Sequence, residues 1–244
     1  MIVSPHNEKL KLVRKLRERK HREREELFAT EGEDLLEAGL GSGAEPRFVL
    51  SAAGSGIGGE EVEPELLAGV SALGSGTRAI AVWPLRWATE ARSTCVYLHA
   101  IADPGNVGAI VRSADALLGG GVVLGPGCAD PFSPKATRAS MGSIFAAPPL
   151  RAELAATPRP RVALVAHGGE EPAALAGAAT ICLGAEREGL PEEALAACER
   201  RVTIPLRPGG PDSLGVAAAA AIALERVASG EKRLSSPAMQ EAAE

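Results

Sequence analysis

The stretch that decides the fold is CVYLHAIADPGNVGAIVRSADALLGGGVVL, residues 95–124. It begins and ends with short aliphatic runs, at residues 95–100 and 121–124, which suit strands that are buried on both faces. Between them, apolar residues recur at helical spacing over residues 107–118. A strand, a helix and a second strand in this order predict a crossover unit, in which the two strands run parallel in one sheet.

The same alternation continues along the chain. Further strands are predicted at residues 161–166, 180–183 and 201–204. Further helices are predicted at residues 133–141, 192–198 and 214–228. This pattern indicates an α/β domain whose parallel sheet is covered on both faces. Ligands of such sheets bind beyond the carboxyl ends of the strands, so a functional site is predicted at that edge.

Three polar loops lie at the predicted edge. The first is DPGNVG at residues 103–108, which leads to Arg112. The second is GAEREGLP at residues 184–191, and the third runs from IP at residues 204–205 to DSLGV at residues 212–216. Glycine and proline in such loops let main-chain groups approach a flat ligand closely. The ordered set of loops therefore predicts one shared ligand site.

In this order the loops resemble the three signature motifs of the SpoU/TrmH family, which comprises RNA ribose 2′-O-methyltransferases of the SPOUT class. The residues that carry the resemblance are Pro104, Asn106, Gly108, Arg112, Gly184, Glu186, Gly189, Leu190, Ile204, Pro205, Ser213, Leu214 and Val216. RASMGS at residues 138–143 and the amino-terminal residues 16–37, with FATEG at 28–32, are also similar to the family. The resemblance thus extends over nearly the whole chain.

The resemblance implies a fold and a set of partners. The fold is a parallel-sheet SPOUT methyltransferase domain with a deep carboxyl-terminal trefoil knot, preceded by a small α/β, L30e-like substrate-binding domain. Knots are rare in proteins, so the knot is expected from the resemblance alone and not from the sequence pattern. The cofactor is S-adenosylmethionine and the substrate is RNA, with ribosomal RNA favoured because the amino-terminal extension resembles the ribosomal-RNA-directed members. The implied assembly is a homodimer in which both chains help to complete the active site.

The resemblance also implies roles for individual residues. Catalytic roles fall to Arg112, Asn106, Glu186 and Ser213. Cofactor contacts fall to Ala166, His167, Leu183, Gly184, Glu186, Gly189, Ile204, Leu206, Ser213 and Leu214. A guanidinium does not readily lose its proton, so Arg112 is expected to hold a neighbouring phosphate and to stabilise the developing oxyanion. Asn106 and Glu186 are then expected to order the loop and the arginine.

Each of these residues also has a structural interpretation. Gly108 alone suits helix packing, and Arg112 alone suits an ordinary protein surface. Glu186 could be an acid beside a helix start, and Ser213 could cap the alanine-rich helix that follows it. The chain departs from the family pattern at Gly215, where the third motif usually has asparagine. A role of that asparagine side chain therefore does not carry over.

Positive charge gathers near the amino terminus, although the net charge of the chain is -5. The stretch from residue 9 to 24 is rich in lysine and arginine, and Leu10, Val13 and Leu16 give it a partial apolar face. It is either a solvated amphipathic helix with ion pairs at helical spacing or an electrostatic footprint for RNA. The RNA-binding residues under the second interpretation are Lys11, Arg14, Arg17, Arg19, Lys20 and Arg22, together with Lys135 and Arg138.

Length and composition favour two domains. The chain has 244 residues, and a typical domain has about 150. A polar stretch at residues 84–93 predicts the boundary, which gives residues 1–92 as the RNA-binding domain and residues 93–230 as the methyltransferase domain. Residues 231–244 are polar and lack periodicity, so they are predicted to form a flexible tail.

Metal and membrane sites are not expected. The four cysteines, Cys95, Cys128, Cys182 and Cys198, form no CxxC pair, so they predict buried free thiols instead of a zinc site or a disulfide framework. No apolar run approaches the ~20 residues that span a bilayer. The polar start lacks the apolar centre of a signal peptide, so a cytoplasmic location is expected.

The leading functional hypothesis is an RNA 2′-O-methyltransferase that acts on ribosomal RNA, with transfer RNA as the second substrate. A second hypothesis is a catalytically weak RNA-binding protein of the same fold, which Gly215 supports. A third, a generic nucleotide-binding α/β enzyme, is disfavoured because no GxGxxG follows the first clear strand.

Overall fold

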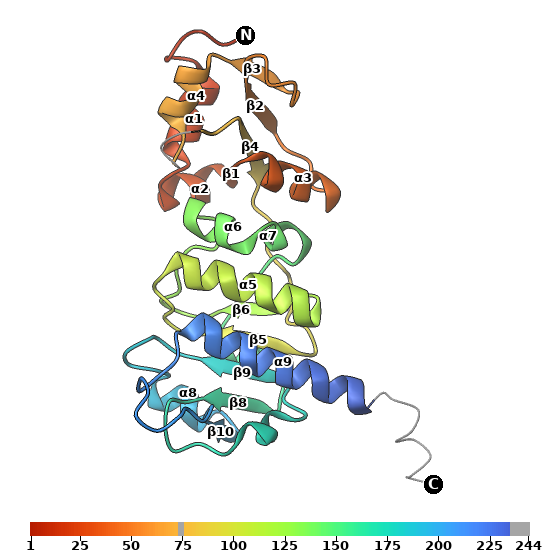
Figure 1. The fold of residues 1–244 in the computed structure, drawn as a ribbon, viewed down its shortest axis with the longest axis vertical. Helices are drawn as coiled ribbons and strands as arrows, with labels where there is room; N and C mark the ends of the chain where they lie inside the picture. The colour runs from red at the N-terminus through yellow and green to blue at the C-terminus, as the bar shows by residue number, and fades with distance from the viewer. Residues whose placement is uncertain (73–75, 235–244) are drawn as a thin grey trace. The chain divides into compact units, whose positions relative to one another are not determined.

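The computed structural model of the protein describes residues 1–72 and 76–234. Contacts divide the chain into two compact units (Figure 1). The first unit consists of Met1–Arg86 and Asp130–Ala146, and the second of Trp87–Ala129 and the chain from Ala147 on. Each unit is built around its own sheet, so each has a core of its own.

The sheet of the second unit is parallel throughout and has the strand order β10-β8-β9-β5-β6-β7. Its strands are β5 (Cys95–Leu98), β6 (Val122–Leu124), β7 (Leu150–Arg151), β8 (Arg161–Leu164), β9 (Thr180–Leu183) and β10 (Arg200–Val202). The five predicted strands are confirmed, with ends that differ by up to two residues. The sequence pattern does not predict β7, because two residues are too few to show a period.

Two long helices cover one face of this sheet. The helix α5 (Pro104–Leu118) packs along α9 (Val216–Leu234), and Figure 1 shows the two side by side. The Asp103 carboxylate caps α5 by accepting a hydrogen bond from the main-chain amide of Asn106 at 3.0 Å. Pro104 lies in the first turn of α5. The helix ends at Gly119, whose left-handed φ of 70° suits glycine.

Shorter elements cover the opposite face. They are α8 (Glu192–Ala196) and the 3-10 helix η1 (Leu154–Ala156), while a second 3-10 helix, η2 (Pro172–Leu175), contacts α9. Leu154, Leu190 and Ala194 pack on this face against Tyr97 and Cys182. A parallel sheet covered on both faces is therefore confirmed, whereas the trefoil knot stays a prediction.

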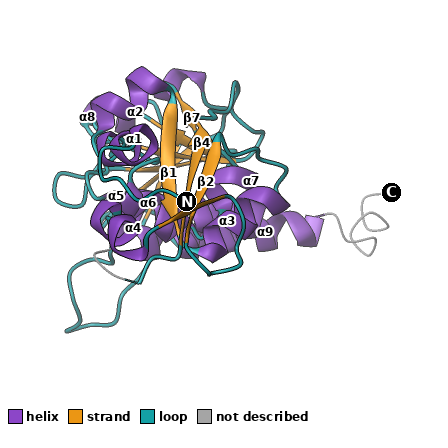
Figure 2. Ribbon diagram, turned by 90° about the horizontal axis from the view of Figure 1, so that it is seen from above, coloured by secondary structure: helices purple, strands orange, loops and turns teal. Residues whose placement is uncertain are grey.

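The first unit has a four-stranded sheet in the order β1-β4-β2-β3. The strands are β1 (Leu27–Glu31), β2 (Phe48–Ala52), β3 (Glu60–Val62) and β4 (Ala79–Pro84). Figure 2 shows β1, β4 and β2 side by side; β1 and β2 are each antiparallel to β4, and β3 is parallel to β2. The helices are α1 (Glu8–Lys15), α2 (Arg19–Glu25), α3 (Glu33–Gly41) and α4 (Pro64–Val70). Leu10, Val13 and Leu16 are buried, which confirms the predicted apolar face of the basic stretch.

A segment from the middle of the chain, Asp130–Ala146, completes the core of the first unit. It holds the helices α6 (Pro134–Ser140) and α7 (Ser143–Ala146). The ring of Phe132 lies 5.0 Å from that of Phe28, and the ring of Phe145 lies 4.7 Å from that of Trp83. Because aromatic rings bury large apolar areas, these two phenylalanines anchor the segment. The sequence predicts one continuous domain from residue 93, and it does not reveal these distant partners.

Arg22 was expected to bind RNA, and that expectation is wrong for this residue. Its side chain is only 4% exposed, and its guanidinium pairs with the Asp130 carboxylate at 2.6 Å. It also donates to the main-chain oxygens of Leu16 and Arg17, at 2.7 and 2.8 Å. These hydrogen bonds occupy the guanidinium inside the unit, so it is not available to a phosphate.

The carboxyl-terminal helix is longer than predicted. α9 continues to Leu234, so the first residues of the tail predicted from residue 231 are helical. The rest of that predicted tail, residues 235–244, lies outside the described residues. Within the described ranges, no helix combines the length and the apolar character needed to cross a membrane.

We predict that Asp130→Ala lowers the free energy of unfolding by about 3–5 kcal/mol, because it leaves the buried Arg22 charge without its partner. Urea unfolding followed by circular dichroism measures the loss. The double variant Arg22→Met/Asp130→Leu replaces both charges with apolar groups and should recover most of it. A loss below about 1 kcal/mol for Asp130→Ala, typical of an exposed pair, would contradict the buried ion pair.

Candidate functional site

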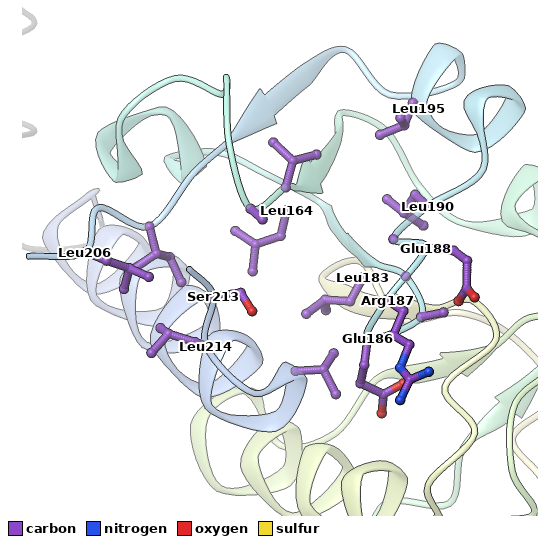
Figure 3. A pocket seen from close by; sticks show the side chains of 17 residues that line it. Leu164, Leu183, Glu186, Arg187, Glu188, Leu190, Leu195, Leu206, Ser213 and Leu214 are labelled. Atoms are coloured by element: carbon purple, nitrogen blue, oxygen red, sulfur yellow. The ribbon is translucent and has the colours of Figure 1, made fainter. Parts of the chain in front are cut away.

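A cavity of about 330 Å³ opens at the carboxyl ends of β8, β9 and β10, which is the edge where the sequence predicts a ligand. Figure 3 shows Leu206 and Leu214 on one side of it and Leu183 and Leu190 on the other. Most of the lining side chains are aliphatic, and a few are polar. This make-up is usual for a pocket that binds a small organic molecule.

The loop after β9 depends on a close contact between main-chain groups. A side chain at Gly184 would lie 2.1–2.2 Å from the main chain of Gly189 and Leu190, so only glycine fits there. The Gly189 amide donates to the Ala185 oxygen at 2.9 Å, and Gly189 has a left-handed φ of 69°. The loop therefore folds back on itself as a tight turn, and its residues 184–190 line the cavity.

A side-chain hydrogen bond joins the first loop to the second. The side-chain nitrogen Nδ2 of Asn106, at the start of α5, donates to Glu186 Oε1 at 2.9 Å. Asn106 is held in place because the Asp103 cap accepts from its main-chain amide. Glu186 lines the cavity and Asn106 does not. The hydrogen bond joins the two loops, and the role of Asn106 in ordering the loop and the arginine stays a prediction.

The third loop enters the cavity through Ser213 and Leu214. In Figure 3 the Ser213 hydroxyl points toward the interior of the cavity. Ser213 does not cap the following helix, because α9 begins at Val216 and the Ala219 amide donates to the Gly215 oxygen at 3.0 Å. Gly215 therefore takes the capping position. A Cβ added at Gly215 would meet nothing within 4 Å, so the space directly beside this position is open.

Nearly all of the residues for which cofactor contacts were expected line the cavity. Those that line it are Ala166, Leu183, Gly184, Glu186, Gly189, Ile204, Leu206, Ser213 and Leu214. His167 is not among the lining residues, and it is exposed in the segment after β8. The expected contact of His167 therefore finds no support in the geometry.

Other lining residues were not among the expected cofactor contacts. They are Leu164, Val165, Ala185, Arg187, Glu188, Leu190, Leu195 and Val216. Most of them adjoin a predicted residue, so extending each motif by one or two positions would have found them. Leu195 is different because it lies on α8. Only the packing of α8 on the sheet brings Leu195 to the cavity.

Arg112 lies on α5 with an exposed side chain, and it does not line the cavity. The chain as described therefore brings the second and third loops together around one space and leaves Arg112 outside it. Periodicity places Arg112 on a helix beside the strand ends, but it does not fix the direction of the side chain.

The other residues expected to bind RNA are on the surface or partly exposed. Several of them pair with neighbours: Lys11 with Glu8 at 2.7 Å, Arg19 with Glu23 at 2.9 Å and Lys20 with Glu18 at 2.8 Å. Exposed pairs of this kind contribute about 0–1 kcal/mol each, so a phosphate can replace the carboxylate. Lys135 and Arg138 are exposed on α6 in the same unit. Ion pairing at helical spacing and RNA binding are thus compatible here.

Charged groups at the cavity come from one loop. Glu186, Arg187 and Glu188 are all exposed at its rim. No cluster of three histidine, cysteine, aspartate or glutamate side chains that could hold a metal ion occurs in the part of the chain that the structure describes.

Both units match known protein domains. Residues 93–225 match the SpoU rRNA Methylase family, and residues 7–80 match the MRM3-like substrate binding domain. An uncharacterised tRNA/rRNA methyltransferase of Mycobacterium bovis is 39% identical over 152 residues, which are 56% of this chain and 52% of that protein. A 23S rRNA guanosine 2′-O-methyltransferase of Bacillus subtilis is 32% identical over 163 residues, 63% of this chain and 65% of that protein. The chain thus spans about half of the first relative and just under two thirds of the second.

Solved structures resemble both units at once. A crystal structure of an AdoMet-bound rRNA methyltransferase from Sinorhizobium meliloti has a TM-score of 0.81 and 26% identity, and the match covers 96% of this chain and 98% of that one. A protein from Porphyromonas gingivalis, described as an RNA methyltransferase of the TrmH family, has a TM-score of 0.76 and 29% identity, with 93% and 98% covered.

We predict that Gly184→Ala weakens binding of S-adenosylmethionine, the cofactor that the resemblance implies, by about tenfold or more, roughly 1.4 kcal/mol. The added methyl group would displace the Gly189 and Leu190 main chain that lines the cavity. Isothermal titration calorimetry measures the affinity. Gly215→Ala is the matched control, because it adds the same methyl group between the cavity residues Leu214 and Val216, at a position where a Cβ meets nothing within 4 Å. Unchanged affinity for Gly184→Ala would contradict the close contact as the basis of the loop.

Proposed function

Because the chain belongs to the SpoU rRNA methylase family, we propose that it transfers the methyl group of S-adenosylmethionine to a ribose 2′-hydroxyl of ribosomal RNA. The observation that carries the proposal is the cavity, which is lined by the second and third motif loops at the carboxyl edge of a parallel sheet. Transfer RNA is the alternative substrate. A cytoplasmic location accords with either RNA and stays a prediction.

The chemistry of the cavity lining suits S-adenosylmethionine. Leu164, Leu183 and Leu214 offer apolar surfaces that suit the faces of an adenine ring. The second loop brings Gly184, Ala185 and Gly189 to the wall of the cavity, where main-chain amides and carbonyls can meet polar edges of the ligand. The carboxylate of Glu186 favours a positive sulfonium nearby. When bound, the cofactor supplies an electrophilic methyl group, and the protein supplies its placement.

The remaining task of the protein is to bring a ribose hydroxyl into line with the methyl group. Correct placement of two reacting groups contributes several kcal/mol to lowering a barrier. The Asn106–Glu186 hydrogen bond fixes the loop beside the cavity. Arg112 is the positively charged group that we assign to the phosphate next to the reacting ribose and to the developing oxyanion.

A dimer would explain why Arg112 stands outside the cavity of its own chain. We assign the missing arginine to a second copy, whose Arg112 would reach the cavity across a two-fold interface. One observation supports an interface on α5 and α9: each helix exposes a large hydrophobic residue, Leu117 at 37% and Ile222 at 38%.

We predict that Arg112→Ala reduces methyl transfer by about 100-fold or more while the affinity for S-adenosylmethionine stays within about twofold. Transfer of a radiolabelled methyl group to ribosomal RNA measures the first quantity, and calorimetry measures the second. Arg200→Ala is a control, because Arg200 is the first residue of β10 and lies at the amino end of that strand, whereas the cavity lies at the carboxyl ends. Loss of both transfer and cofactor binding would give Arg112 a structural role instead.

Mixed dimers test the assignment of Arg112 to the second copy. At a low concentration of S-adenosylmethionine, Arg112→Ala and Gly184→Ala alone are each expected to have little activity, since one lacks the arginine and the other binds the cofactor weakly. After subunit exchange, a mixed dimer holds one intact cavity that faces an intact Arg112, so activity should return. No recovery in exchanged dimers, or a monomer in sedimentation experiments, would contradict the shared site.

The first unit is proposed to hold the RNA through its basic surface. We predict that replacing Lys11, Arg14, Arg19 and Lys20 with alanine weakens RNA binding for all sequences alike and lowers the salt dependence of the affinity. The logarithmic slope should fall by roughly one for each lost phosphate contact. Filter binding at several salt concentrations measures this. An unchanged slope would mean that these side chains only form ion pairs on the surface.

The same experiments separate a methyltransferase from a binding protein that keeps the fold. Binding of cofactor and RNA without transfer of label would favour the second function. Gly215→Asn would then be the informative variant, because it restores the side chain of the family pattern at a position where a Cβ meets nothing within 4 Å.

A further inference from the structure

An arginine and a tryptophan stack on each other at one edge of the parallel sheet, and the proposed reaction uses neither of them. The Arg151 guanidinium carbon lies 4.5 Å from the centroid of the Trp87 ring. Arg151 is the last residue of the edge strand β7 and is exposed, whereas Trp87 is half-buried and packs against the core. The pair is therefore a planar cation that lies over an aromatic ring at the surface of the second unit.

Main-chain hydrogen bonds hold the two segments that form this stack. The Ala88 amide donates to the Pro149 oxygen at 3.0 Å, so the chain that carries Trp87 runs beside the chain that enters β7. After β7, the Ala152 amide donates to the Leu124 oxygen at 3.2 Å and continues the pairing with β6. The stack is thus in place before a ligand arrives, which lowers the entropic cost of binding.

The register of the sheet connects the stack to the cavity. Leu183, which lines the cavity, is paired with Leu98 on β5. Leu98 is paired with Leu124, and Leu124 is paired with Arg151. Residues paired in this way lie in one row across the sheet, with their side chains on the same face. The three leucines form part of one core cluster, and Trp87 packs against that cluster. Arg151 therefore ends a row that begins at the wall of the cavity.

The distance between the stack and the cavity suits a short stretch of RNA. Neighbouring strands lie about 4.8 Å apart, so the three strand spacings from β9 to β7 place Arg151 about 14 Å from Leu183. Neighbouring nucleotides of a stacked strand are about 3.4 Å apart, so roughly four of them cover this distance, and fewer do when the strand is extended. With the reacting ribose at the cavity, flanking nucleotides of the same RNA reach the end of β7.

We propose that Arg151 is a stacking platform for an unpaired base of the RNA substrate, a few nucleotides from the ribose that is methylated. A guanidinium is planar and weakly hydrated, so one of its faces can lie on an indole ring while a base stacks on the other. Stacking of this kind accepts any base, because every base has a flat π face. The identity of the RNA and the place of its ribose rest on the proposed function, whereas base stacking does not depend on methyl transfer.

Two other roles are open to an exposed arginine at this place, and variants separate them. It could only cover the Trp87 ring, or it could bind a phosphate as a plain positive charge. Arg151→Ala removes the charge and the planar group, whereas Arg151→Lys keeps the charge and an alkyl stem but has no planar face. Arg201→Ala is the matched control, because Arg201 is exposed on the opposite edge strand, β10, and pairs with the Glu192 carboxylate at 3.4 Å.

Binding of single-stranded RNA tests the platform without methyl transfer. The probes are fluorescein-labelled oligoadenylate and an oligomer of the same length built from a stable abasic ribose analogue. Fluorescence anisotropy gives the ratio of the two affinities, which reports on the bases because the phosphates are shared. Arg151→Ala should lower this ratio by about tenfold relative to the wild type, and Arg151→Lys should lower it equally. Arg201→Ala should leave the ratio within about twofold of the wild type.

The same ratios show what would overturn the platform. An unchanged ratio in Arg151→Ala would mean that the arginine only covers the Trp87 ring. A ratio that Arg151→Lys retains would mean that charge alone is enough, as in a phosphate contact. Circular dichroism checks that each variant is folded, and both substitutions are at an exposed position.

Methyl transfer tests whether the platform serves the reaction. Arg151→Ala should raise the KM for ribosomal RNA by about tenfold and leave the affinity for S-adenosylmethionine, measured by calorimetry, within about twofold. An unchanged KM together with a lowered oligoadenylate ratio would overturn the placement of the platform on the path of the substrate. No transfer by the wild type would count against the proposed function instead, and the anisotropy ratios would still decide the stacking.

Discussion

The strands of the second unit's sheet all run in one direction, and the site depends on that constraint. The carboxyl ends of β8, β9 and β10 meet at one edge, so the loops that follow them share one cavity although they are far apart in sequence. Within this frame, the second loop can turn tightly only because Gly184 has no side chain to keep the Gly189 main chain away. The Asn106–Glu186 hydrogen bond then ties the loop after β5 to the same edge.

Local sequence predicts most of this fold, because the strands and helices of a parallel α/β sheet each carry a complete periodic pattern. Residues 95–124 alone contain a strand, a helix with its caps and a second strand. What the sequence does not reveal is pairing between distant segments. Phe132 and Phe145 pack on Phe28 and Trp83, and Asp130 pairs with Arg22, so a segment from within the predicted second domain belongs by its contacts to the first unit.

The same limit applies to the site. Most of the motif residues on loops at the strand ends line the cavity, because a parallel sheet fixes where such loops lie, and their roles stay predictions. Leu195 was missed, since its place at the cavity depends on how α8 packs. Arg112 was predicted from its motif, yet a helical position does not determine which way its side chain points, and it stands outside the cavity. That displacement is the reason for proposing that a second copy contributes the arginine.

Charge and chemistry are divided between the two units. The chain has a net charge of -5, but nine of its 26 lysines and arginines lie within residues 9–24 of the first unit, where the RNA is proposed to bind. The cavity belongs to the second unit. Nucleoside analysis of ribosomal RNA that has been incubated with the protein and labelled S-adenosylmethionine tests the central claim most directly. The account predicts label in a 2′-O-methylated nucleoside, resistant to alkaline cleavage of its 3′ phosphodiester; label in a methylated base, or none in RNA, would contradict it.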